Sequence, residues 1–198
     1  QATVVVTQNT TTPVVNSAAS NTLTCLNTSV NASATTTTSP VSYNWSGTGI
    51  ISATNISTIT VNQPGTFNYT VTNTTNGCST TGSQTVVQNT TSPVVASAVS
   101  GVLNCTLTSV SASATTTTTP VSYNWSGTGI TSATNISTIT VNQPGTFNYT
   151  VTNTSNGCSI GGSQTVTQNT ATPAVTSGVS SVLNCTTTSV NVNATTTT

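Results

Sequence analysis

The sequence predicts an all-β fold of tandem β-sandwich repeats, each about 80 residues long, standing head to tail in a rod. Its 198 residues include no Lys, Arg, Asp, Glu or His, whereas ordinary soluble domains carry charge on about a quarter of their residues. Val, Ile and Thr dominate instead, which favours strands over disorder. No segment has a convincing helical period. An internal repeat covers the whole chain, and its length suits a small sandwich of about seven strands.

The repeat is defined by near-identical segments and by a motif that recurs at the same position of each repeat. Residues 40–74 recur as residues 120–154 with one difference, Ile51 against Thr131. Gln-Asn-Thr recurs at residues 8, 88 and 168, each time shortly before a proline. We therefore expect four segments: the last strand of a preceding repeat at 1–7, a first repeat at 8–87, a second at 88–167 and an incomplete third at 168–198.

The first strands of a repeat follow from alternating apolar and small polar residues, because successive side chains of a strand point to opposite faces. A broken first strand is expected over residues 13–19 and 22–25. The next strand, 29–36, places Val30, Ala32 and Ala34 on one face.

The later strands contain the aromatic residues. Residues 41–46 alternate in the manner of a central strand with its tryptophan in the core, 57–61 form a further strand, and 66–72 give the clearest alternation. Asn76-Gly77 predicts a tight hairpin turn into the last strand, 78–88. The core aromatic residues expected in the two repeats are Tyr43, Trp45, Phe67, Tyr69, Tyr123, Trp125, Phe147 and Tyr149.

The order of these motifs resembles the immunoglobulin-like or PKD-like repeats of giant cell-surface adhesins of gliding and other secreting bacteria, including SprB-like repeats. The resemblance rests on a Cys before a short strand, Tyr43-Asn44-Trp45, the strand over 64–72, Asn76-Gly77-Cys78 and the final strand. It implies immunoglobulin-like sandwiches in an extracellular appendage at the cell surface. Such repeats usually contain acidic residues, so this charge-free version gives no argument for calcium between units.

The cysteines are expected to form structural disulfides, because the chain otherwise reads as secreted and their spacing is not that of a zinc site. They occupy two positions of the repeat: Cys25, Cys105 and Cys185 in one, Cys78 and Cys158 in the other. One pairing joins cysteines within each repeat, Cys25–Cys78 and Cys105–Cys158. The other joins neighbouring repeats through Cys25–Cys158, because the two positions lie at opposite ends of an immunoglobulin-like sandwich. The sequence leaves both open.

Enzymatic function is excluded by composition. General acid–base catalysis needs side chains that titrate near neutral pH, and a Ser, Thr or Cys nucleophile needs a base or cation to activate it. No catalytic residue, cofactor or metal ligand is therefore expected. Nucleic-acid binding is excluded because phosphate recognition draws on Lys and Arg, and no apolar run is long enough to span a membrane.

Asn-x-Ser/Thr sequons are dense, although a chain so rich in these residues produces them by composition alone. As candidate glycosylation sites we note Asn27, Asn31, Asn55, Asn73, Asn104, Asn135 and Asn153. The function expected is a structural shaft or spacer of a surface filament, with or without an adhesive surface. Its partners are neighbouring repeats of the same or identical chains, and surface glycans. The alternative is a carbohydrate- or surface-binding module, with ice binding as a weaker variant.

Overall fold

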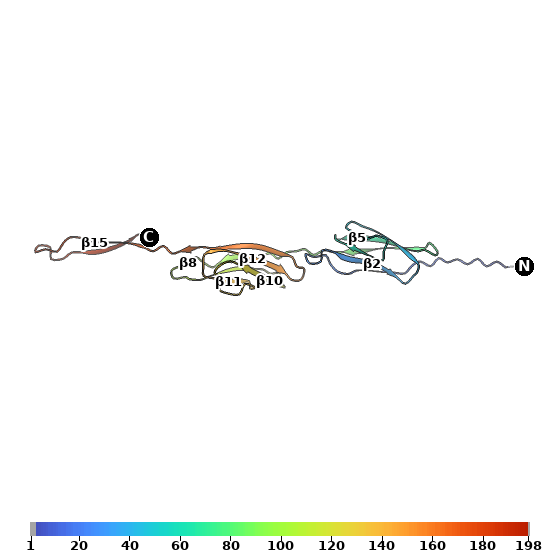
Figure 1. Ribbon diagram of the computed structural model, residues 1–198, viewed down its shortest axis with the longest axis horizontal. Coiled ribbons are helices and arrows are strands. Elements are labelled where there is room, and N and C mark those ends of the chain that lie inside the picture. The colour runs from blue at the N-terminus through green and yellow to red at the C-terminus, as the bar shows by residue number, and fades with distance from the viewer. Residues whose placement is uncertain (1–2, 198) are drawn as a thin grey trace.

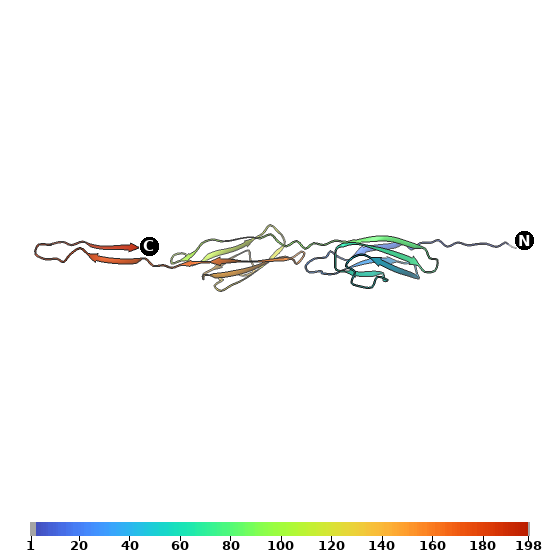
Figure 2. The ribbon, with the colours of Figure 1, turned by 90° about the horizontal axis from the view of Figure 1, so that it is seen from above.

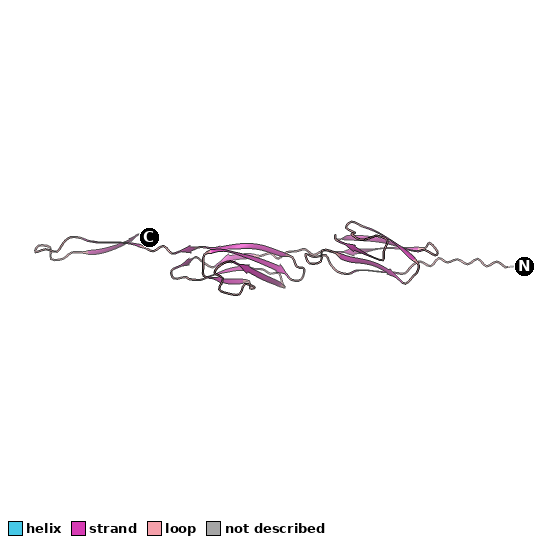
Figure 3. Ribbon diagram, in the orientation of Figure 1, coloured by secondary structure: helices cyan, strands magenta, loops and turns pink. Residues whose placement is uncertain are grey.

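The computed structural model describes residues 3–197, which form two β-sandwich units and a two-stranded hairpin placed end to end along one long axis (Figures 1 and 2). All regular elements drawn are strands (Figure 3). The fold confirms the tandem immunoglobulin-like sandwich predicted from the sequence. Within residues 3–197, no helix has the length and apolar character needed to cross a membrane.

The first unit packs two antiparallel three-stranded sheets against each other. One sheet has the order β1-β2-β4, and the other has the order β3-β5-β6. A short parallel bridge joins Leu23 to Gln88, just after β6, with the Leu23 amide donating to the Val87 carbonyl at 3.0 Å. The strands are β1 (Val15–Ala19), β2 (Val30–Thr36), β3 (Val41–Ser46), β4 (Thr58–Val61), β5 (Gly65–Asn73) and β6 (Ser79–Val86).

The core of the first unit follows from the alternation of its strands. Val30, Ala32 and Ala34 of β2 are buried on one face, while the residues between them face outward. They belong to one cluster with Trp45 and Phe67 from the opposite sheet. Because successive residues alternate between faces, a single apolar row on each strand suffices to build the core.

One sequence expectation needs correction. Residues 41–46 were expected as a central strand, but β3 lies at the edge of its sheet and β5 lies between β3 and β6. Alternation reports which face of a strand is buried, and it carries no information on how many neighbours the strand has. Trp45 is nevertheless 3% exposed, because burial comes from the opposing sheet.

The second unit repeats this architecture. Its sheets have the orders β7-β9-β11 and β10-β12-β13, and the parallel bridge recurs as a two-residue pairing of β8 with β14. The strands are β7 (Ala96–Val99), β8 (Leu103–Asn104), β9 (Val110–Thr115), β10 (Val121–Ser126), β11 (Thr138–Val141), β12 (Gly145–Asn153), β13 (Ser159–Val166) and β14 (Gln168–Asn169).

The C-terminal hairpin contains only the first two strands of the pattern. β15 (Ala174–Val179) pairs with β16 (Val192–Thr197) in the same register as β1 with β2, so that Val179 faces Val192 as Ala19 faces Ala32. Val192 is 74% exposed because no second sheet covers it. At the other end, residues 3–14 form no strand, and residues 1 and 2 lie outside the described part. The assignment of residues 1–7 to a preceding repeat, like the other repeat boundaries, stays a prediction.

Candidate functional site

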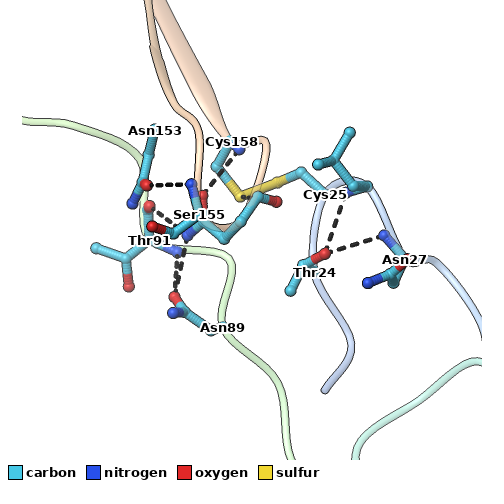
Figure 4. The surroundings of a disulfide bond; sticks show 10 residues. Thr24, Cys25, Asn27, Asn89, Thr91, Asn153, Ser155 and Cys158 are labelled. Atoms are coloured by element: carbon cyan, nitrogen blue, oxygen red, sulfur yellow. Dashed lines mark hydrogen bonds between the residues drawn. A yellow bond between two sulfur atoms is a disulfide. The ribbon is translucent and has the colours of Figure 1, made fainter. Parts of the chain in front are cut away.

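The joint between the two sandwich units is the site at which the structure concentrates specific contacts. Cys25 precedes β2 at one end of the first unit, and Cys158 precedes β13 at the near end of the second. Their sulfur atoms form a disulfide, with Cα atoms 5.1 Å apart and a sequence separation of 133 residues (Figure 4). The disulfide therefore joins one unit covalently to the next.

This connectivity decides between the two pairings that the sequence left open. Cys25 is bonded to Cys158 and not to Cys78, and Cys105 is not bonded to Cys158. The pairing within repeats is therefore wrong. Its physical reason is the length of the strands, because a strand of eight or nine residues separates the two ends of a unit by far more than a disulfide can span.

Each half of the disulfide is held by a local turn. On the first unit, the Thr24 hydroxyl accepts hydrogen bonds from the amides of Leu26 and Asn27, at 3.2 and 2.9 Å. On the second, the side-chain oxygen of Asn156 accepts from the Cys158 amide at 2.9 Å. Such side-chain to backbone bonds fix short turns without help from a sheet, so each cysteine lies in a turn with hydrogen bonds of its own.

The segment that links the units is bonded to both of them. The Asn89 amide donates to the Leu23 carbonyl of the first unit at 2.8 Å. The Asn156 side-chain amide of the second unit donates to Asn89 Oδ1 at 3.1 Å and to the Thr91 carbonyl at 3.0 Å. Figure 4 labels the two acceptor residues, Asn89 and Thr91. A linker whose polar groups are bonded on both sides has little freedom to bend.

A close contact completes the joint. Leu26, next to Cys25, lies against Gly157, next to Cys158, and a Cβ added to Gly157 would collide with the leucine side chain. Gly157 also has a φ of 73°, a left-handed conformation that favours glycine. Glycine is thus required there both by the turn and by the neighbouring unit.

The Asn-Gly-Cys turn is more deeply buried in the second unit than in the first, although the three residues are the same. Asn156 and Cys158 are 1% exposed, whereas Asn76 and Cys78, at the same positions of the first unit, are only half-buried. The two turns are otherwise alike: the Asn76 side-chain amide donates to Asn9 Oδ1 and the Thr11 carbonyl, at 3.1 and 3.0 Å. The difference in exposure is therefore produced by the neighbouring unit that covers only the second turn.

The remaining cysteines are unpaired. Cys78 is half-buried, and Cys105 and Cys185 are exposed. Cys105 and Cys185 sit in turns resembling that of Cys25, although an asparagine replaces Thr24: Asn104 and Asn184 each accept hydrogen bonds from the two residues after the cysteine. All three cysteines of this position are thus presented at turns before the second strand of their repeats.

The aromatic residues lie in or against the cores and not at the joint. Trp45, Phe67, Tyr69, Trp125 and Phe147 are buried, and Tyr43, Tyr123 and Tyr149 pack against the same clusters. Trp45 donates from Nε1 to the Ile56 carbonyl at 3.0 Å, and Trp125 makes the equivalent bond to Ile136. Neither indole is free to stack on a ligand.

The sequons divide by exposure. Asn73 is 9% exposed and Asn104 and Asn153 are half-buried, and the side-chain oxygen of each bonds a following backbone amide. Asn27, Asn31, Asn55 and Asn135 are exposed. Among the described residues, no group of three or more His, Cys, Asp or Glu side chains is placed to hold a metal ion.

No role at a joint was predicted from the sequence for Leu26, Asn89, Asn156 or Gly157, although the last three belong to motifs noted there. Asn89 and Asn156 belong to motifs that recur, Gln-Asn-Thr and Asn-Gly-Cys, and this recurrence is a usable signal. Leu26 gives none, because its equivalents are Thr106 and Thr186.

No family model matches the chain, and no curated protein matches it either. Several solved structures of multidomain proteins are similar to it at low identity. The three N-terminal domains of the bacteriophage RB49 highly immunogenic outer capsid protein are 16% identical, with 94% of this chain and 70% of that chain covered and a TM-score of 0.45. The titin I-band fragment I67–I69 is 11% identical, with 84% of this chain and 69% of that chain covered and a TM-score of 0.38.

A C-terminal fragment of intimin, solved in complex with the intimin-binding domain of its translocated receptor, is 15% identical, with 81% and 66% of the two chains covered and a TM-score of 0.39. These are likenesses in fold. They do not identify the function of this chain.

Proposed function

We propose that the chain is a structural repeat segment of an extracellular surface filament or adhesin, and that it serves as shaft or spacer. The observation that supports this most directly is the joint. The units are bonded by Cys25–Cys158, the linker is hydrogen-bonded to both through Asn89, and the units lie in line (Figure 1). A joint with these three properties holds successive units at a fixed distance and direction.

The disulfide and the composition favour an extracellular location. Disulfides persist in oxidising compartments and are rare in the cytosol. A surface without Lys, Arg, Asp or Glu is wetted by hydroxyl and amide groups, whose hydration does not change with pH or ionic strength. Together with the motif order described above, this leads us to place the chain among the repeats of bacterial surface adhesins of the gliding type.

We propose further that the joint is repeated along the filament. Cys78 is held in the same turn as Cys158, with its amide bonded to Asn76 Oδ1 at 3.0 Å, and it is open where Cys158 is covered. Cys78 would pair with the first-position cysteine of a preceding unit. Cys105 and Cys185 would pair with following units. The partners of the chain are thus units of its own kind, and the repeats run over 8–87, 88–167 and from 168.

A carbohydrate-binding role has less support. The two tryptophans are 3% exposed, so they offer no platform for a sugar ring. An open hollow of about 380 Å³ is lined by Val94–Ala96 and Thr115–Thr117, without an aromatic residue. In the two sandwich units the threonine runs continue past the strands, because β2 ends at Thr36 and β9 at Thr115, so these runs do not form the flat ranks that ice binding needs.

Imaging of intact cells that produce the protein would test the proposal. Antibodies raised against the chain should label surface filaments along their length, and the filaments should show an axial repeat of about 35–45 Å, the length of a sandwich with a short linker. Label confined to the cell interior, or filaments without this repeat, would contradict a shaft. Label at filament tips alone would favour an adhesive end module.

A further inference from the structure

The position of the disulfide in the chain determines how a pulling force crosses the molecule. Cys25 lies near the start of the first unit and Cys158 near the end of the second, so the bond closes a loop that contains every strand from β2 to β12. Only β1 and the strands from β13 onward lie outside this loop. The two cores are therefore built almost entirely from residues inside it.

We propose that Cys25–Cys158 acts as a covalent bypass, which carries tension from one end of the chain to the other without loading the sandwich cores. Tension applied at the two ends runs along the backbone to Cys25, crosses the bond to Cys158 and continues into β13. The loop ends are 5.1 Å apart at their Cα atoms. Because this distance is fixed covalently, the loop takes no share of the extension.

The strands outside the loop suit this path. β1 runs through the first unit toward the joint, and β13 begins at Ser159, immediately after the bonded cysteine, and leads toward β14 and the hairpin. Figure 2 shows these strands lying along the long axis of the molecule. An extended strand has little slack, at about 3.3 Å per residue, so the bypass is nearly taut in the folded state.

Without the bond, tension would have to cross each unit through its hydrogen bonds. In the first unit the resisting contact between entering and leaving segments would be the Leu23–Gln88 bridge, with the amides of Leu23 and Asn89 donating across it. The pairing of β1 with β2 and of β5 with β6 would carry load alongside this bridge, so tension would act on the hydrogen bonds of both sheets. The bypass is a property of where the bond lies, and it does not depend on the chain serving as a shaft in a filament.

Single-molecule stretching of the 198-residue chain, held at its ends by enzymatically ligated handles that avoid thiols, measures this directly. Under non-reducing conditions only residues outside the loop should extend. After a thiol reductant is added to the same molecule, a further contour of roughly 450 Å should be released, from 133 residues at about 3.4 Å each. The double variant Cys25→Ser/Cys158→Ser should release this length without reductant, while Cys105→Ser should behave as the unmodified chain does.

Two outcomes would overturn the proposal. Release of the full contour by the unreduced chain would show that the bond does not form in the folded protein. Release of roughly 180 Å of contour in each of two separate steps after reduction would show that the cysteines are paired within each unit instead. Both outcomes are measured on the unmodified chain, so the result does not depend on the folding of any variant.

Discussion

The Asn156 side chain donates a hydrogen bond to Asn89 Oδ1 at 3.1 Å, and Asn89 in turn donates its own amide to the Leu23 carbonyl of the other unit. This relay couples the hairpin turn of one sandwich to the edge of its neighbour through the linker.

Replacement of Asn156 should therefore destabilise the chain more than replacement of its equivalent. Asn156→Ala removes two donated bonds and the acceptor for the Cys158 amide at a site 1% exposed, which costs about 1–3 kcal/mol when buried partners are left unpaired. Asn76→Ala removes the same set where water can replace it. Urea unfolding under non-reducing conditions measures the loss of unfolding free energy in each variant. Equal losses would show that the contacts at the joint do not contribute to stability.

The contact of Leu26 with Gly157 predicts a second asymmetry. Gly157→Ala and Gly77→Ala place a methyl group at nearly the same left-handed φ, 73° and 75°, at a similar backbone cost of about 1 kcal/mol. Only the former collides with Leu26, since nothing lies within 4 Å of a Cβ at Gly77. Re-formation of Cys25–Cys158 in a glutathione redox buffer should be slowed in Gly157→Ala alone. Equal rates for the two variants would count against the contact.

Within the second unit, two neighbouring glycines of β13 should respond in opposite ways. Gly162 faces Tyr149 across the sheet, and a Cβ there would collide with the tyrosine hydroxyl. Gly162→Ala should cost about 1–3 kcal/mol of unfolding free energy. Gly161 has room, its nearest neighbour being the Tyr149 carbonyl oxygen at 3.5 Å, so Gly161→Ala should be neutral or stabilising by about 0.4–1 kcal/mol. Denaturant titration of both variants checks the pair, and similar losses would contradict the packing described.

The absence of charge predicts stability that is independent of pH. No Asp, Glu or His is present, so the side chains of the folded and unfolded states bind the same number of protons between about pH 4 and about pH 7. The slope of unfolding free energy against pH should be close to zero, with a total change under about 0.5 kcal/mol. Thermal unfolding at several pH values, with the disulfide intact, measures it. A clear pH optimum would show that this account omits a titrating interaction.

The sequence predicted the strands and their buried faces well because these depend on local alternation. Val30, Ala32 and Ala34 could be assigned to one face before any neighbour was known, and β5 was evident from Phe67, Tyr69 and Val71. The edge position of β3 was missed, since the number of neighbours of a strand is set by sheet topology and leaves no periodic trace.

The joint was predictable only in part, for a related reason. The two cysteine positions could be recognised, but their partners depended on how one unit meets the next. The Asn156–Asn89 bond links segments 67 residues apart, and the Leu26–Gly157 contact involves a position that changes between repeats. The recurrence of Gln-Asn-Thr and Asn-Gly-Cys marks Asn89 and Asn156 as repeated positions, but it does not show that the two side chains meet, and Leu26 is not repeated at all.

Cys105 lies inside the loop that Cys25–Cys158 closes, and Cys185 lies outside it. In an array that continued this pattern, the loops closed by successive disulfides would overlap and form two parallel covalent paths, each of which crosses every second joint through a disulfide. If one inter-unit disulfide were reduced or broken, the tension that it carried would pass to the overlapping disulfide beside it. Such a fibre would fail only after damage at two adjoining places, a redundancy that a row of separately bridged domains would not have.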